Sequence, residues 1–271
     1  MTSRSGDEPP AAAFFDLDKT IIATSSTLAF GRSFYAEGLL TRADIAKGAW
    51  ARLVYHLGGV DEDRMARLRD GLARTVTGWD AAWVDGVVAR ELEHLINPLV
   101  YDEAAELIES HHAAGRDVVI VSSSGDQVVA PIGRLLGADH VIATRMTVAE
   151  GRYTGELDFY AFGPYKAQAM ARLAAEQGWD LADCYAYSDS ETDVPMLAAV
   201  GHPAAVNPDR GLRRAALERG WPVLRFRHPV PLRQRVGRAA VPPRPVAIGL
   251  AGAAVAAAGW GAVRVHTRRA G

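Results

Sequence analysis

Cysteine is nearly missing from this sequence, in which Cys184 is the only one in 271 residues. A single cysteine excludes an internal disulfide bond and fits a protein that works in a reducing compartment. An excess of either charge is also missing, because 30 Lys and Arg residues are balanced by 32 Asp and Glu residues. The resulting net charge of −2 argues against a general nucleic-acid-binding protein. We therefore expect a cytoplasmic globular protein that does not bind nucleic acid.

The two ends of the chain lack the composition of a folded core. Residues 1–10 are polar and contain no apolar stretch like that of a signal peptide, so we expect a disordered tail. Residues 229–245 are rich in Arg and Pro and are expected to form a linker. Residues 246–263 carry no charge but are dominated by Ala and Gly. This segment fits a transmembrane tether, a helix lying on a membrane surface or a soluble Ala-rich helix, and all three interpretations stay open.

Three short apolar runs far apart in the chain each end in polar side chains. Residues 12–15 are followed by Asp16 and Asp18, and residues 118–121 are followed by a run of serines. Residues 184–187 lead into a loop that contains Asp189. Ligands bind along the carboxyl ends of the strands in open parallel sheets. The three endings therefore predict one shared site.

The two carboxylates after the first run need a partner. Asp16 and Asp18 repel each other in a buried site unless a divalent cation lies between them or one of them holds a proton. Either arrangement is useful for catalysis. A helix N-cap followed by a second acid in the turn is the alternative interpretation of this pair alone.

Four motifs in a fixed order resemble the haloacid dehalogenase superfamily of phosphatases, in particular the branch around phosphoserine phosphatase. The resemblance covers residues 14–226, roughly four-fifths of the chain. The motifs are an Asp-x-Asp-x-Thr run, a Ser after a strand, a lone Lys and an acidic pair. In this sequence they are matched by Asp16, Asp18 and Thr20, then by Ser122, Lys166, Asp189 and Asp193.

The alternation of strands and helices predicts an α/β fold with a doubly wound parallel sheet. We assign residues 11–25 and 98–228 to this catalytic core. Residues 26–97 show helical stripes, one of them at Val84, Val88, Leu92 and Leu95, and no strand alternation. They predict an inserted all-helical domain, which the resemblance identifies as a cap over the active site.

Two local expectations concern the core. Residues 138–144 predict a short strand, and residues 146–148 with 153–157 predict a separate hairpin with a Gly turn. Residues 102–113 predict a helix that ends in His111 and His112, where positive charge is favourable.

The resemblance implies that Asp16 is a nucleophile that forms an aspartyl-phosphate. Asp18 would protonate the leaving alkoxide and then deprotonate the attacking water. An Asp carboxylate cannot approach a phosphate dianion without a cation, and Mg²⁺ suits oxygen ligands. The expected Mg²⁺ ligands are Asp16, the backbone carbonyl of Asp18, and Asp189.

The remaining site residues are expected to bind phosphate or to support the others. Ser122 and Ser123 would donate hydrogen bonds to the phosphoryl group, and Lys166 would add a fixed positive charge. Thr20 would brace the turn after the carboxylates. Asp193 would position Lys166 or metal-bound waters, or else simply begin a helix.

The sequence thus predicts a Mg²⁺-dependent phosphomonoester hydrolase for a small phosphorylated metabolite. No acid occurs between Lys19 and Phe30, where phosphoserine phosphatases usually carry a Glu that recognises the substrate ammonium. This departure weakens the interpretation as a phosphoserine phosphatase proper. A membrane-associated regulatory protein that retains the phosphatase fold, and a phosphotransferase with the same residues, are also compatible with the sequence.

Overall fold

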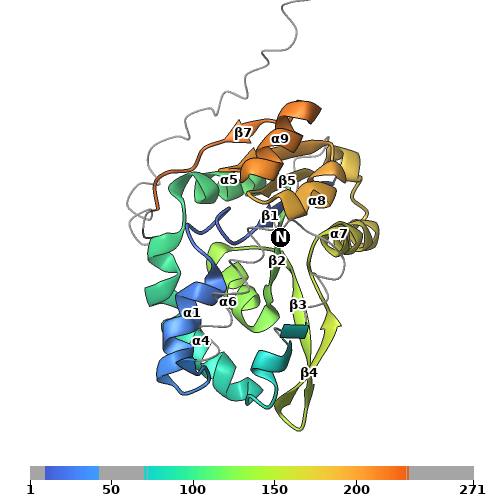
Figure 1. Ribbon diagram of the computed structural model, residues 1–271. Coiled ribbons are helices and arrows are strands. Elements are labelled where there is room, and N and C mark those ends of the chain that lie inside the picture. Colours follow the sequence, from blue (N-terminus) through green and yellow to red (C-terminus); the bar gives the residue numbers. More distant parts are fainter. Residues whose placement is uncertain (1–9, 43–69, 72, 230, 232–271) are drawn as a thin grey trace, which may run out of the picture. The chain divides into compact units, whose positions relative to one another are not determined.

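The computed structural model describes residues 10–42, 70–71, 73–229 and 231 (Figure 1). The predicted segment 246–263, nearly all of the predicted tail and linker, and the middle of the predicted cap lie outside these residues. Among the described helices, none combines the length and apolar character needed to cross a membrane.

A seven-stranded sheet forms the centre of the described fold, in the order β4-β3-β2-β1-β5-β6-β7. All neighbouring strands are parallel except β3 and β4, which are antiparallel. The strands are β1 (Ala12–Asp16), β2 (Asp117–Gly125), β3 (His140–Ala149), β4 (Arg152–Phe159), β5 (Tyr185–Ser188), β6 (His202–Val206) and β7 (Val223–Leu224). The predicted α/β fold with a mostly parallel sheet is confirmed.

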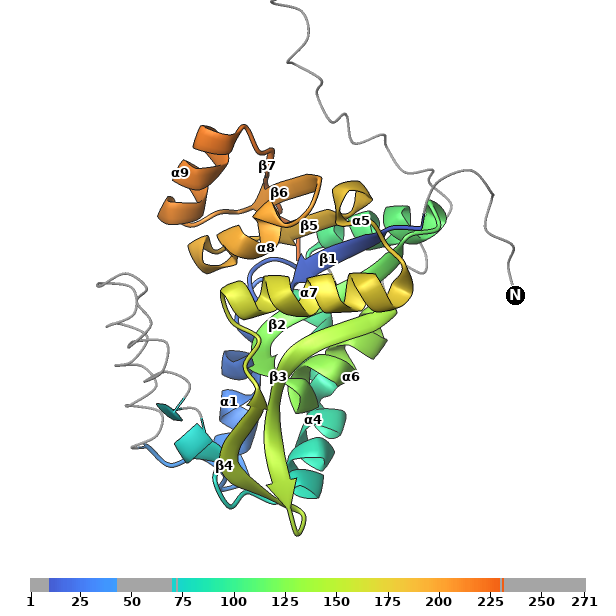
Figure 2. The ribbon, with the colours of Figure 1, turned by 90° about the vertical axis from the view of Figure 1, so that its right-hand side faces the viewer.

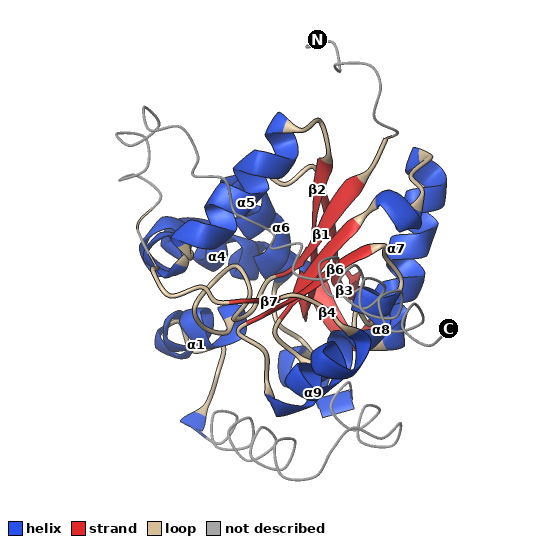
Figure 3. Cartoon of the chain, turned by 90° about the horizontal axis from the view of Figure 1, so that it is seen from above, coloured by secondary structure: helices blue, strands red, loops and turns tan. Residues whose placement is uncertain are grey.

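Helices cover both faces of the sheet (Figure 3). They are α5 (Asp102–Ala113) and α6 (Asp126–Leu136) on one face, and α7 (Pro164–Gln177), α8 (Val194–Ala198) and α9 (Arg210–Arg219) on the other. Short 3-10 turns lie at Asn97–Leu99, Leu181–Asp183 and Glu191–Asp193. Gly178 ends α7 in the left-handed conformation, with φ of 73°, which a residue without Cβ adopts at little cost.

The central strand β1 supplies side chains to both faces because successive residues of a strand point to opposite sides. Ala13 and Phe15 belong to the apolar cluster shared with α5 and α6. Ala12 and Phe14 belong to the cluster shared with α7, α8 and α9. Every residue of β1 is buried, so the strand that carries Asp16 is held from both sides.

The described part of the region inserted after β1 is helical, as predicted. It contains α1 (Ser26–Ala36) and α4 (Ala81–Leu95). Asp80 caps α4 by accepting a hydrogen bond from the backbone N–H of Trp83. The predicted stripe of α4 faces inward: Val84 and Val88 are buried and Leu92 packs beside them, in the same cluster as residues of α6.

Strand β3 corrects one expectation. The predicted short strand and the first arm of the predicted hairpin are one continuous strand, which pairs with β2 at its start and with β4 at its end. A turn at Glu150 and Gly151, both with positive φ, joins β3 to β4. The resulting hairpin runs alongside the inserted helices (Figure 2). Backbone hydrogen bonds join it to that region, from Gly78 N–H to Tyr153 O and from Tyr153 N–H to Trp79 O.

Strand β7 is only two residues long, and beyond it the side-chain amide of Asn207 forms two hydrogen bonds with the backbone of Phe226. One further expectation is corrected. His111 does not supply charge at the end of α5. It is buried, and burial, together with the smaller effects of Arg116 and His112, lowers its pKa to about 4.

Candidate functional site

The carboxyl ends of three neighbouring strands form the candidate site. Strand β1 lies between β2 and β5 in the sheet. Asp16 is the last residue of β1, Ser122 lies near the end of β2, and Ser188 is the last residue of β5. The predicted juxtaposition of these three segments is present in the structure.

A buried lysine joins two of the predicted carboxylates. Lys166 lies in the first turn of α7, and its Nζ is 2.7 Å from Asp16 Oδ1 and 2.8 Å from Asp193 Oδ2. The side chains of Lys166, Asp16 and Asp193 are 3%, 9% and 2% exposed. Ion pairs this deeply buried interact more strongly than surface pairs, because water does not screen them.

Two hydroxyl groups complete this cluster. Thr20 Oγ1 donates to Asp16 Oδ2 at 3.2 Å, which places Thr20 where it braces the carboxylate as well as the turn. Ser188 Oγ donates to Asp193 Oδ2 at 2.7 Å. Both oxygens of Asp16 therefore have a partner, and its carboxylate has one orientation.

The electrostatics of the cluster are set by burial. Burial raises the pKa of Asp16 well above its ordinary value, more than Lys166 lowers it, and Asp193 and Asp189 raise it further. Burial alone would lower the pKa of Lys166, but Asp16 and Asp193 reverse this effect and raise it. The lysine is therefore a permanent cation at the site.

Asp189 follows β5 and lies beside the same cluster. Burial raises its pKa to about 7, Lys19 opposes this rise, and Asp193 and Asp209 add to it. Lys19 Nζ is 4.0 Å from Asp189 Oδ2. The backbone of Lys19 is left-handed, with φ of 64°, so the chain turns sharply just after the two aspartates of the first motif.

The donor set suits a hard cation with few protein side-chain ligands. Asp16 and Asp189 are buried carboxylates with raised pKa values, and a cation between them would relieve the cost of ionising both. Within the described part of the chain, no three His, Cys, Asp or Glu side chains come together as a metal site. The predicted set of Asp16, the backbone carbonyl of Asp18 and Asp189 therefore stays a prediction, and its oxygen atoms are ligands of the kind Mg²⁺ binds.

Asp18 is held separately from Asp16. The backbone N–H of Ser26, the first residue of α1, donates to Asp18 Oδ1 at 2.7 Å. Ser124 Oγ donates to Asp18 Oδ2 at 3.1 Å. Ser26 Oγ and Thr27 Oγ1 lie 3.0 and 3.3 Å from Ser124 Oγ.

The two predicted phosphate-binding serines differ in their surroundings. Ser122 is buried, and its Oγ accepts a hydrogen bond from the backbone N–H of Ser124 at 3.2 Å. Ser123 is half-buried, and its carbonyl accepts from Thr144 Oγ1 at 2.8 Å. Ser122 is therefore fixed near the end of β2, and within the described part of the chain its own hydroxyl hydrogen has no recorded acceptor.

Sequence reasoning missed Ser26, Thr27, Ser124 and Ser188. All four side chains contact a site aspartate directly or through one hydroxyl. The available signal was compositional only: hydroxyl residues are concentrated in segments 24–27, 122–124 and 188–192. Which of these hydroxyls meet which aspartate depends on long-range packing.

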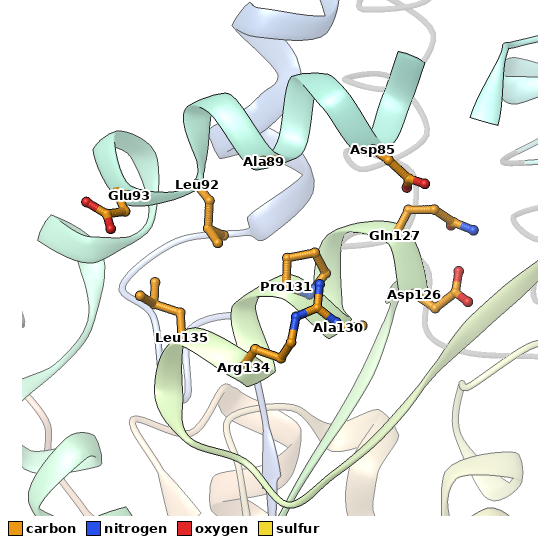
Figure 4. A pocket seen from close by; sticks show the side chains of 10 residues that line it. All are labelled: Asp85, Ala89, Leu92, Glu93, Asp126, Gln127, Ala130, Pro131, Arg134 and Leu135. Carbon is orange, nitrogen blue, oxygen red and sulfur yellow. The ribbon is translucent and has the colours of Figure 1, made fainter. Parts of the chain in front are cut away.

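A separate cavity of about 770 Å³ lies between α4 and α6 (Figure 4). Asp85, Asp126 and Gln127 lie at one end of it, and Leu92 and Leu135 face each other towards the other end. Its lining contains none of the predicted site residues. The cavity is therefore distinct from the cluster around Asp16.

The chain matches one protein family and is similar in sequence to three relatives. Residues 13–198 match the haloacid dehalogenase-like hydrolases. The chain is 56% identical over 262 residues to the "Inhibition of morphological differentiation protein" of Streptomyces azureus, covering 96% of this chain and 95% of that protein. It is 56% identical over 225 residues to "Probable phosphatase Rv3661" of Mycobacterium tuberculosis, covering 83% and 78%. "Phosphoserine phosphatase SerB1" of the same organism is 35% identical over 260 residues, covering 93% and 82%.

Two solved structures are similar in fold. A protein of unknown function from Bordetella pertussis has a TM-score of 0.70 and 28% identity, covering 80% of this chain and 99% of that one. A phosphoserine phosphatase, solved as a phospho-aspartyl intermediate analogue, has a TM-score of 0.58 and 20% identity, covering 85% and 99%. The chain therefore belongs to the haloacid dehalogenase-like hydrolases, in the branch that contains the phosphoserine phosphatases.

Proposed function

We propose that this protein is a Mg²⁺-dependent phosphatase that hydrolyses a small phosphorylated metabolite through an aspartyl-phosphate. The observation that carries the proposal is the buried ammonium of Lys166, 2.7 Å from Asp16 Oδ1 at the end of the central strand. A buried cation beside an oriented carboxylate suits attack on a phosphoryl group, whose oxygens carry negative charge.

In this mechanism Asp16 attacks phosphorus and forms the covalent intermediate. Thr20 and Lys166 hold the carboxylate in place. Lys166 also faces the negative charge of the transferred group. Ser122 donates its hydroxyl hydrogen to a phosphoryl oxygen, since its oxygen already accepts the N–H of Ser124.

Asp18 transfers the protons. In the first step the leaving oxygen takes the electron pair of the broken P–O bond and a proton from Asp18. In the second step Asp18 takes a proton from the water that attacks the aspartyl-phosphate, so that Asp16 is regenerated. Alternation of one group between acid and base is expected for a two-step hydrolysis.

A bound Mg²⁺ would neutralise charge on the phosphate and orient it for in-line attack. Asp16, the backbone carbonyl of Asp18, and Asp189 would hold it. When they are ionised, the carboxylates of Asp16 and Asp189 have lone pairs and no hydrogen to donate. This is the property that oxygen ligands of a hard cation need.

The test is a panel of phosphate esters with purified protein. Wild type should release inorganic phosphate from at least one small monoester, lose activity in excess chelator, and regain it with Mg²⁺ but poorly with Ca²⁺. Asp16→Asn should abolish turnover, and Asp158→Asn, on the exposed end of β4, should not. Activity of Asp16→Asn within about tenfold of wild type, or about 1.4 kcal/mol, would show that Asp16 is not the nucleophile.

A regulatory role is the second candidate, favoured by the name of the Streptomyces azureus relative, "Inhibition of morphological differentiation protein". The catalytic set argues that such a role would operate through dephosphorylation. An effect on a host cell that Asp16→Asn still produces would instead support a regulator that retains the fold without its chemistry.

A further inference from the structure

Ser124 connects three segments at the carboxylate of Asp18. Its backbone N–H donates to Ser122 Oγ, and its hydroxyl donates to Asp18 Oδ2. The same hydroxyl is 3.0 Å from Ser26 Oγ and 3.3 Å from Thr27 Oγ1, both in the first turn of α1. Ser124 is 8% exposed, so these contacts face little competition from water.

Counting hydrogens constrains the direction of each contact. A serine hydroxyl has one hydrogen to donate and can accept two, whereas an ionised carboxylate only accepts. The Ser124 hydrogen goes to Asp18 Oδ2. Ser26 Oγ donates to Ser124 Oγ, and Thr27 Oγ1 can either donate to Ser124 Oγ or accept from it.

We propose that Ser124 is a positioning residue that aims Asp18 Oδ2 at the leaving group, and this inference rests on the proposed phosphatase function. Asp18 Oδ1 is occupied by the N–H of Ser26 at 2.7 Å, which a protonated oxygen could not accept as well. A backbone N–H cannot turn away from Oδ1, whereas the hydroxyl of Ser124 can rotate, so we assign Oδ2 as the oxygen that faces the leaving group.

A hydroxyl suits both halves of the reaction. When Oδ2 carries the proton, it donates to Ser124 Oγ, and the hydrogen of Ser124 turns to Thr27 Oγ1. When the leaving oxygen takes that proton together with the electron pair of the P–O bond, Oδ2 becomes charged and Ser124 turns its hydrogen towards it. When water returns a proton to Oδ2, the arrangement is restored. Alanine at position 124 could neither donate a hydrogen bond to Oδ2 nor accept one from it, whereas the hydroxyl of threonine could do both.

Two esters that differ in their need for a proton test this role. An alkyl phosphate requires protonation of its leaving oxygen, whereas p-nitrophenolate leaves as an anion. Both values of kcat/KM are measured for wild type, Ser124→Ala and Ser124→Thr, with Ser110→Ala on the exposed side of α5 as the control. The ratio of the two values is the readout, since partial unfolding lowers both equally.

Ser124→Ala should lose about 10- to 100-fold on the alkyl ester, the size expected for one hydrogen bond to a charged group. It should lose less than about threefold, or about 0.7 kcal/mol, on p-nitrophenyl phosphate. Ser124→Thr and Ser110→Ala should keep the wild-type ratio.

Equal losses on both esters would assign Ser124 a merely structural role and overturn the inference, with the phosphatase function intact. A wild type that cleaves aryl esters alone would overturn it too, because no leaving group would then need the proton. A wild type that hydrolyses no phosphate ester would instead overturn the proposed function itself.

Discussion

Acidification should destabilise the fold through one buried histidine, His111. Its Nε2 is 2.9 Å from the hydroxyl of Tyr187, and its Nδ1 is buried without a hydrogen-bond partner among the described residues. The rings of Phe15, Tyr185 and Tyr187 surround it, with centroids 4.8 to 5.9 Å away. Protonation would add a second N–H and a positive charge where nothing described accepts either.

The size of the effect follows from its pKa. Burial lowers the pKa of His111 from 6.5 to about 4, and one pKa unit corresponds to about 1.4 kcal/mol. Between these two pH values the unfolded chain binds a proton at this position and the folded chain does not, so the free energy of unfolding falls as the pH falls. The full contribution, about 3 kcal/mol, is present above pH 6.5 and lost by about pH 4.

Other groups also titrate in this range, so the variant His111→Gln isolates the histidine. Glutamine keeps a polar group near the Tyr187 hydroxyl and cannot take up a proton. Urea unfolding of both proteins across the pH range should give a difference in unfolding free energy that shifts by about 3 kcal/mol against wild type on acidification. If this difference in unfolding free energy stays constant across the pH range within about 0.5 kcal/mol, the reasoning is refuted. His111 would then take up its proton in the folded protein as readily as in the unfolded chain.

Two further outcomes are expected. Lys166→Met should lower the free energy of unfolding at neutral pH by about 3–5 kcal/mol, because it leaves Asp16 and Asp193 buried without their cation. Urea unfolding measures this loss. A loss below about 1 kcal/mol would mean that the ion pairs of Lys166 contribute little to stability. Other small phosphomonoesters should match or exceed phosphoserine in kcat/KM, because residues 20–29 offer no counter-charge for an ammonium group. A preference for phosphoserine of about a hundredfold, or 2.7 kcal/mol, would point to an acid elsewhere in the cap.

Local patterns predict the frame of the site well. The apolar run before Asp16 and the helix at residues 102–113 match β1 and α5 closely, because burial of a strand on both faces and a helix stop at Gly115 are short-range signals. The same patterns divide the continuous strand β3 in two, since its polar outer half has no partner in the core sheet and pairs only with β4.

The partners of each carboxylate are harder to predict. Asp16 and Lys166 are in contact although they are 150 positions apart in the sequence, and Asp18 and Ser124 are in contact although they are 106 positions apart. The family motif includes Lys166, but no spacing rule selects Ser124 from three consecutive serines. The pKa of His111 likewise depends on rings contributed by β1 and β5, which the sequence around the histidine does not contain.

The attachment of the β3–β4 hairpin to the inserted helices has a consequence for solubility. Strand β4 ends the sheet on one side, and an open edge strand invites pairing with another molecule. Here the outward N–H and C=O of Tyr153 are already bonded to Trp79 and Gly78. Gly155 lies so close to Thr77 that any side chain there would collide with it. At the opposite side β7 is two residues long. Loosening the segment around Gly78 should therefore expose a pairing edge and promote aggregation before the core itself unfolds.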